Sequence, residues 1–218
     1  MSLAIFDLDN TLLGGDSDYL WGQFLVGNGV VDCAVFEHEN RRFYTAYCNG
    51  TLDIQEYLEF VLQPLAAHEP AVLYAWRERF IAERIHPLIL PKATALLQSH
   101  REAGDILLII TATTRFVTEP IAEALGVSHL LATEVEMKDG RYTGKSFDIP
   151  CFQEGKVRRL EVWLNKNNYT LEDSWFYSDS LNDLPLLSRV TYPVAVDPDN
   201  TLACYARKRG WPIISLRE

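Results

Sequence analysis

The chain has 218 residues, of which 20 are Lys or Arg and 30 are Asp or Glu, so its formal charge is −10. This acidity, without any Lys- or Arg-rich block, excludes a footprint on nucleic acid or on an anionic membrane surface. Apolar residues make up 48% of the chain, which is typical of a folded globular protein and excludes intrinsic disorder.

Cysteine usage and the N-terminal sequence indicate the cellular compartment. No apolar run approaches the ~18 residues of a membrane-spanning helix, and the N-terminus lacks the basic region of a signal peptide. The four cysteines are widely spaced and form no C-x-x-C pair, so neither structural zinc nor a disulfide framework is expected. We therefore expect a cytoplasmic protein with reduced thiols.

The first predicted element is a buried strand over residues 3–7, which ends in an acid. In the stretch that follows, apolar side chains recur at helical spacing and strand signals are weak. Ser17 and Asp53 are candidate N-caps there, and Pro70 suits a first helical turn. We predict that residues 16–86 form an all-helical insertion of about four helices.

From residue 87 onward, predicted strands and helices alternate, which is typical of a parallel sheet with helices on both faces. Strands are expected at 106–110, 174–177, 192–196 and 213–216, and helices at 91–104, 118–125, 156–164 and 200–209. Asp139 and Gly140 predict the turn of a hairpin over residues 130–142. The fold class is therefore α/β with a doubly wound parallel sheet, in which residues 1–15 and 87–218 form the core domain around the helical insertion.

Four short motifs fall at related places in this pattern. Three lie at the carboxyl ends of predicted strands: Asp-Leu-Asp-Asn-Thr-Leu at residues 7–12, Thr111, and Ser-Asp-Ser-Leu-Asn-Asp at residues 178–183. The fourth is Lys156, at the start of a predicted helix. Each motif alone has an ordinary structural explanation, such as a solvated turn, a strand-end cap or a solvent-facing helix residue. Because open parallel sheets bind ligands at the carboxyl ends of their strands, the joint placement predicts one pocket.

The acids of these motifs are predicted to form an anionic cup: Asp7, Asp9, Asp179 and Asp183. Four carboxylates repel one another unless a cation lies among them. Mg²⁺ fits best, because it prefers oxygen ligands and keeps several waters. The metal would also draw a phosphate into an acidic site, where the Lys156 ammonium, the Thr111 hydroxyl and backbone N–H groups can donate to phosphoryl oxygens.

Taken together, the motifs resemble those of the haloacid dehalogenase (HAD) superfamily, over residues 3–14 and 87–200. The insertion resembles the helical type 1 cap of that superfamily. Residues 132–136 before the hairpin turn, with Glu154-Gly155-Lys156 beyond it, resemble the phosphoserine-phosphatase-like branch (subfamily IB). The resemblance implies a Rossmann-like core and hydrolysis of a phosphate monoester.

This resemblance also implies catalytic roles. Asp7 would be the nucleophile that attacks phosphorus in line and forms an aspartyl-phosphate. Asp9 would be the general acid for the leaving alcohol and then the base for the attacking water. An acid at this second position favours hydrolysis, because the ion-pumping relatives carry Thr there.

The same resemblance implies the metal and phosphate ligands. Mg²⁺ would be held by the carboxylates of Asp7 and Asp179 and by the backbone carbonyl of Asp9. Asp183 would act through a metal-bound water or by orienting Lys156. Two donors would neutralise the transferring phosphoryl group: Thr111 and Lys156.

Substrate contacts are predicted at six positions: Asp16, Arg41, Arg42, Ala112, Thr113 and Asn182. Asp16 lies near the place where phosphoserine enzymes carry a carboxylate for the substrate amine, although a loop acid or helix cap would also explain it. The two arginines, on a predicted helix, could reach a substrate carboxylate or be solvated. The sequence departs from the phosphoserine enzymes where Thr111-Ala112-Thr113 replaces Ser-Gly-Gly and where Ser178 replaces Gly.

The predicted function is a Mg²⁺-dependent phosphatase acting on a small phosphorylated metabolite. An amino-alcohol phosphate such as phosphoserine or histidinol phosphate would suit the acid at Asp16, and the sequence does not choose between them. One alternative is a phosphotransferase that passes the phosphoryl group to an alcohol. A non-catalytic regulatory protein on a HAD core would predict loss of the key residues, yet all are present: Asp7, Asp9, Lys156 and Asp179. The oligomeric state is not predicted.

Overall fold

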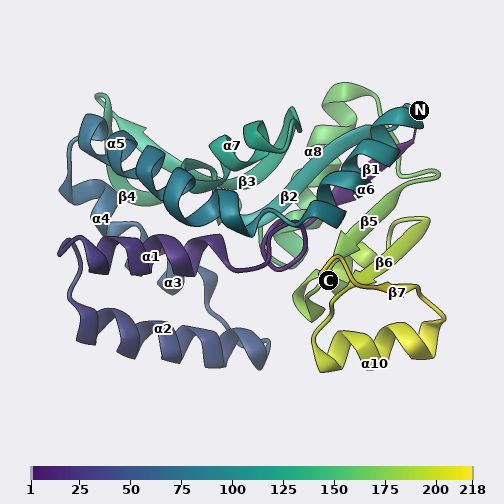
Figure 1. Cartoon of the computed structure of the whole chain (residues 1–218), viewed down its shortest axis with the longest axis horizontal. Coiled ribbons are helices and arrows are strands. Elements are labelled where there is room, and N and C mark those ends of the chain that lie inside the picture. Colours follow the sequence, from purple (N-terminus) through teal and green to yellow (C-terminus); the bar gives the residue numbers. More distant parts are fainter. Residues whose placement is uncertain (1, 218) are drawn as a thin grey trace.

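A seven-stranded sheet organises the computed structural model, which describes residues 2–217 (Figure 1). The strands are β1 Leu3–Phe6, β2 Ile106–Thr114, β3 His129–Lys138, β4 Arg141–Phe147, β5 Trp175–Ser178, β6 Tyr192–Val196 and β7 Ile213–Ile214. They lie in the order β4-β3-β2-β1-β5-β6-β7, and every neighbouring pair is parallel except β3 and β4. The predicted doubly wound α/β fold is confirmed, with β1 between β2 and β5.

Two hydrophobic clusters cover the two faces of the sheet. β1 contributes Ala4 and Phe6 to one cluster and Leu3 and Ile5 to the other, as the alternation of side chains along a strand requires. The helices of this part of the chain are α6 Pro91–Glu102, α7 Arg115–Ala124, α8 Glu154–Asn167, α9 Leu184–Leu187 and α10 Asn200–Arg209, with a 3-10 helix at Leu181–Asp183. The core therefore fixes the central strands from both sides.

In the segment between β1 and α6 an isolated bridge joins Leu13 and Ile89, and residues 16–86 form helices, as predicted, although more than the about four expected. The helices are α1 Ser17–Gly27, α2 Cys33–Cys48, α3 Ile54–Val61, α4 Gln63–Ala67, α5 Pro70–Phe80, a π-helical turn Ile81–Ile85 and a 3-10 helix His86–Leu88. α1 packs on both α5 and α7, because the Trp21 ring centroid lies 5.2 Å from that of Phe80 and 5.6 Å from that of Phe116. The segment and the sheet thus share one hydrophobic cluster.

The N-cap predictions were half right. Asp53 caps α3 by accepting hydrogen bonds from the backbone N–H groups of Gln55 and Glu56. Ser17 does not cap α1; Asp16 does, accepting from the backbone N–H groups two and three residues ahead. Ser17 is instead the buried first residue of α1, and its own N–H donates to Asp9 Oδ1 at 2.6 Å.

The second strand is longer than predicted. It was expected to end at residue 110, but β2 continues to Thr114, because pairing with β3 resumes at Thr114 and Thr133 after an irregularity in register. Consequently α7 begins at Arg115 rather than at 118. The predicted hairpin is confirmed as β3 and β4, and its turn residues Asp139 and Gly140 both have positive φ, of 50° and 76°.

Three smaller features complete the description of the fold. The four cysteines are free thiols. The densest basic cluster, Arg207 to Arg209, forms the last turn of α10, where the helix dipole stabilises positive charges. Across residues 2–217, every helix is too short or too polar to span a bilayer.

Candidate active site

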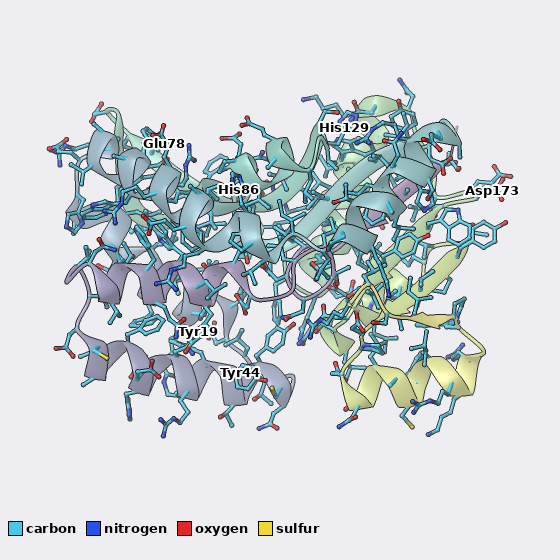
Figure 2. The ribbon with its side chains drawn as sticks, viewed as in Figure 1. Tyr19, Tyr44, Glu78, His86, His129 and Asp173 are labelled. Atoms are coloured by element: carbon cyan, nitrogen blue, oxygen red, sulfur yellow. The ribbon has the colours of Figure 1, made fainter. Side chains whose placement is uncertain are left out.

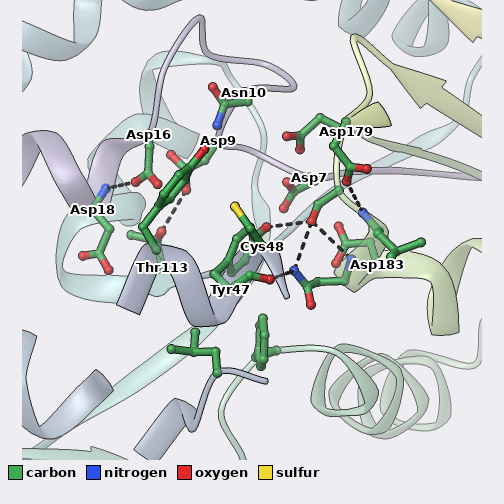
Figure 3. A pocket seen from close by; sticks show the side chains of 18 of the residues that line it. Asp7, Asp9, Asn10, Asp16, Asp18, Tyr47, Cys48, Thr113, Asp179 and Asp183 are labelled. Carbon is green, nitrogen blue, oxygen red and sulfur yellow. Dashed lines mark hydrogen bonds between the residues drawn. The ribbon is translucent and has the colours of Figure 1, made fainter. Parts of the chain in front are cut away.

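The motifs at the ends of three central strands line one cavity of about 390 Å³ (Figure 3). Asp7 follows β1, Thr111 lies in β2, and Asp179 follows β5. The backbone N–H of Asp7 donates to the carbonyl of Tyr177 at 2.9 Å, which aligns the ends of β1 and β5. Of the predicted site residues, those that line the cavity are Asp7, Asp9, Asp16, Thr111, Ala112, Thr113, Lys156, Asp179, Asn182 and Asp183.

Lys156 is held between two carboxylates at the floor of the cavity. Its Nζ lies 2.8 Å from Asp7 Oδ1 and 2.7 Å from Asp183 Oδ1, and the side chain is 3% exposed. Burial alone would lower the pKa of Lys156, but Asp183 and Asp7 outweigh it and raise that pKa, so the ammonium stays charged. Ser178 donates to Asp183 Oδ2 at 2.7 Å. Asp183 therefore contacts Lys156 directly, which supports one of the two roles predicted for it.

Lys156 lies in the first turn of α8. A close backbone contact determines where this turn lies. A Cβ atom on Gly155 would lie 2.0 Å from the carbonyl oxygen of Pro150. Backbone atoms cannot yield as the end of a flexible side chain can. Only glycine fits here, immediately before Lys156.

Replacing Gly155 with Ala is expected to destabilise the protein by about 1–3 kcal/mol, the usual cost of overpacking. A shift of α8 by even about 1 Å would also displace the Lys156 ammonium and lower kcat/KM by about a hundredfold. Urea unfolding and phosphate release measure the two effects. Gly27→Ala is the matched control, because a Cβ at Gly27 meets nothing within 4 Å. Wild-type activity in Gly155→Ala would contradict this account.

Both oxygens of Asp9 accept hydrogen bonds. Oδ1 accepts from the backbone N–H of Ser17 at 2.6 Å. Oδ2 accepts from Thr113 Oγ1 at 2.8 Å (Figure 3). Burial raises the pKa of Asp9 to about 6, the nearby Asp16 adds to this rise, and the two hydrogen-bond donors oppose it. A carboxyl group with such a pKa can give up and take back a proton near neutrality.

The acids at the strand ends carry more negative charge than Lys156 can balance. Burial raises the pKa of Asp7 to about 7 and that of Asp179 well above its ordinary value, and the Asp7 carboxylate adds to the rise in the pKa of Asp179. Thr11 Oγ1 donates to Asp179 Oδ1 at 3.2 Å. This surplus of buried charge and the purely oxygen donor set fit a hard divalent cation.

Few protein side chains would coordinate the metal ion. Among residues 2–217, no three His, Cys, Asp or Glu side chains converge closely enough to hold an ion by themselves. Mg²⁺ would therefore rely on the carboxylates of Asp7 and Asp179, the backbone carbonyl of Asp9, and water. Such a mixture suits Mg²⁺, which dehydrates reluctantly.

At the other end of the cavity, the helical segment supplies a second acidic pair. Asp16 Oδ1 accepts from the backbone N–H groups of Asp18 and Tyr19, while Asp18 Oδ2 accepts from the hydroxyl of Tyr57 at 2.6 Å. Asp18 and Tyr57 were not predicted as site residues. The position of Asp18 two residues after Asp16 was a usable signal, but Tyr57 is 39 residues away on α3 and had none.

Two predicted substrate contacts lie elsewhere. Arg41 is exposed and does not line the cavity, and Arg42 forms ion pairs with Glu39 at 2.7 Å and Glu56 at 2.9 Å. The reason is the phase of α2. Phe43 and Tyr47, one turn apart, line the cavity, so the two arginines point away from it. The geometry gives no support to a substrate contact by either arginine.

The C-terminal end of α2 touches the loop after β5. The hydroxyl groups of Tyr47 and Ser180 are 2.7 Å apart, and Asn182 Nδ2 donates to the carbonyl oxygen of Tyr47 at 3.4 Å. Asn182 Oδ1 in turn accepts from Gln153 Nε2 at 2.8 Å. Asn182 lines the cavity as predicted, but its amide is engaged in these internal contacts.

The fold and the site together define a hydrolase. The chain belongs to the haloacid dehalogenase-like hydrolase family, whose pattern matches residues 4–188. It is 44% identical to a histidinol-phosphatase from Neisseria meningitidis serogroup C, over 99% of each chain. Within this family the protein is a phosphatase, of the phosphoserine-phosphatase-like branch.

Two examples illustrate the similarity to solved structures. One is a protein of unknown function from Bordetella pertussis Tohama I, with a TM-score of 0.92 at 45% identity, covering 99% of this chain and 98% of that one. The other is a substrate-bound phosphoserine phosphatase, with a TM-score of 0.72 at 20% identity, covering 99% of this chain and 93% of that one. The architecture predicted from the motifs is thus that of the phosphoserine phosphatases.

Proposed function

We propose that this phosphatase depends on Mg²⁺ and hydrolyses histidinol phosphate through an aspartyl-phosphate on Asp7. One observation carries the choice of substrate. Within the described residues 2–217, Lys156 is the single Lys, Arg or His side chain that lines the cavity, and it is already bound to Asp7 and Asp183.

The charges around the cavity discriminate between the two amino-alcohol phosphates. Phosphoserine carries a carboxylate, which would meet Asp16 and Asp18 without a cation to balance it. Histidinol phosphate carries an amine and an imidazole ring but no carboxylate, so both of its recognition groups suit an acidic wall. The identity of 44% to a protein named histidinol-phosphatase supports the same choice.

The chemistry would proceed in two displacements. The Asp7 carboxylate attacks phosphorus in line, and the bond to the alcohol oxygen breaks as Asp9 donates a proton to that oxygen. Asp9 then takes a proton from water, whose oxygen attacks the aspartyl-phosphate, releasing inorganic phosphate and restoring Asp7. Lys156 and the Thr111 hydroxyl would donate to the phosphoryl oxygens throughout.

Two features would support these steps. Mg²⁺ bound at Asp7, Asp179 and the Asp9 carbonyl would supply positive charge for the phosphoryl group. Residues 16–86 would serve as a cap over the core formed by residues 1–15 and 87–218, excluding bulk water from the reaction.

A substrate panel tests the proposal. With Mg²⁺ present, kcat/KM for histidinol phosphate is expected to exceed that for phosphoserine by about ten- to a hundredfold, the effect of one unmatched charge. EDTA should stop phosphate release and added Mg²⁺ should restore it. Equal release of alcohol and phosphate in the presence of glycerol would exclude transfer to an acceptor. Faster hydrolysis of phosphoserine, or full activity in EDTA, would contradict the proposal.

A further inference from the structure

The half-buried carboxylate of Asp18 faces the cavity at the end away from Asp7. Tyr57 fixes it by donating its hydroxyl to Oδ2 at 2.6 Å, while within residues 2–217 no hydrogen bond reaches Oδ1. Burial and the neighbouring Asp18 raise the pKa of Tyr57 well above its ordinary value, so the phenol remains a donor. One oxygen of Asp18 is therefore held and the other is available to a ligand.

Aromatic side chains line the same cavity as this carboxylate. The rings of Phe43 and Tyr57 meet edge to face with centroids 5.2 Å apart, and both line the cavity with Tyr19 and Tyr44. Figure 2 shows Tyr19 on α1 and Tyr44 on α2, the two helices that flank this end. Aromatic faces attract cations, and flat rings pack on them. The walls and the acid together suit a flat, positively charged ring.

The order of the acids matches the order of groups along the proposed substrate. Asp9 accepts a hydrogen bond from the backbone N–H of Ser17, the neighbour of Asp16. Asp16 accepts one from the backbone N–H of Asp18 at 3.0 Å. Asp9, Asp16 and Asp18 therefore lie in this order, at increasing distance from the reacting end (Figure 3). In histidinol phosphate the amine is on the carbon next to the ester CH₂, and the imidazole ring is one carbon further. Asp16 thus lies at the level of the amine and Asp18 at the level of the ring.

The geometry points to Asp18, oriented by Tyr57, as the residue that selects substrates with a second cationic group, a protonated imidazole ring, beside the amine. This inference rests on the proposed function and goes beyond it by dividing recognition between two acids. Burial raises the pKa of Asp18 to about 6, with the hydrogen bond from Tyr57 opposing the rise. A bound imidazolium would stabilise the ionised acid.

The test compares two substrates that share the amine and differ in the ring: histidinol phosphate and phosphoethanolamine. Asp18→Asn is expected to raise KM for histidinol phosphate by about ten- to a hundredfold, with a much smaller change in kcat. Its KM for phosphoethanolamine should change less than threefold. Asp16→Asn should raise KM for both substrates, and Tyr57→Phe should act as Asp18→Asn does but more weakly.

Two controls separate recognition from folding. Glu59→Gln removes a charge from an exposed position of α3, the helix that carries Tyr57, and should leave both KM values unchanged. Titration calorimetry with L-histidinol and the Mg²⁺-loaded enzyme gives a binding readout independent of turnover, in which Asp18→Asn should lose about tenfold or more in affinity.

The outcomes distinguish the two proposals. If the wild type shows no preference for histidinol phosphate over phosphoethanolamine, the proposed substrate is wrong. If the wild type has that preference and folded Asp18→Asn keeps it, the substrate stands and the role of Asp18 is overturned. Equal KM increases for both substrates in Asp18→Asn would also overturn that role.

Discussion

Asp7→Asn is expected to lower kcat with p-nitrophenyl phosphate by about four orders of magnitude or more, because an amide cannot attack phosphorus. The same change should leave the free energy of unfolding equal or higher. Burial raises the pKa of Asp7 to about 7, which means that the folded state disfavours its charge, and Asn removes that charge.

Phosphate release and urea unfolding of the same preparation check the two halves of this expectation. Loss of activity with retained stability separates a missing nucleophile from a damaged fold. Undiminished Mg²⁺-dependent release by Asp7→Asn would remove the aspartyl-phosphate from the mechanism.

Lys156→Met is expected to reduce both stability and activity. It leaves Asp7 and Asp183 buried without their shared cation, at a cost of about 3–5 kcal/mol in the free energy of unfolding. It also removes a donor to the phosphoryl group, which should lower kcat by about a hundred- to a thousandfold.

The control is Lys166→Met, an exposed change of the same residue type on the same helix, α8. Lys166→Met should match the wild type in urea unfolding and in turnover of histidinol phosphate. A Lys156→Met protein as stable as Lys166→Met would show that the buried carboxylates do not need their cation.

The sheet and the reacting end of the cavity follow from local sequence patterns. Short apolar runs ending in an acid or a hydroxyl predict buried strands with a functional carboxyl end, and the parallel sheet then brings these ends together. Asp7, Thr111 and Asp179 could therefore be assigned to one pocket before any coordinates were known. The end of β2 could not be predicted, because its last pair, Thr114 with Thr133, forms beyond a break in register.

The substrate end of the cavity depends on how helices pack, which sequence patterns specify poorly. Asp16 is both a cavity residue and the N-cap of α1, so the helix-cap interpretation is confirmed and the contact with a substrate amine stays a prediction. Arg41 and Arg42 lie on the predicted helix, and of the two alternatives left open for them the exposed positions favour solvation. The contact between Tyr57 and Asp18 joins two helices, and no pattern along the chain indicates it.

The anchoring of α1 decides which part of the helical segment can move. The N–H of Ser17 is bound to Asp9, and Trp21 packs on Phe116 of α7, so α1 is firmly attached to the core beside the cavity. By contrast, α2 touches the loop after β5 through Tyr47 at its C-terminal end. We expect substrate entry and product exit to require separation of the Tyr47 and Ser180 hydroxyl groups, while α2 stays packed on α1 through Phe36 and on α3 through Phe43.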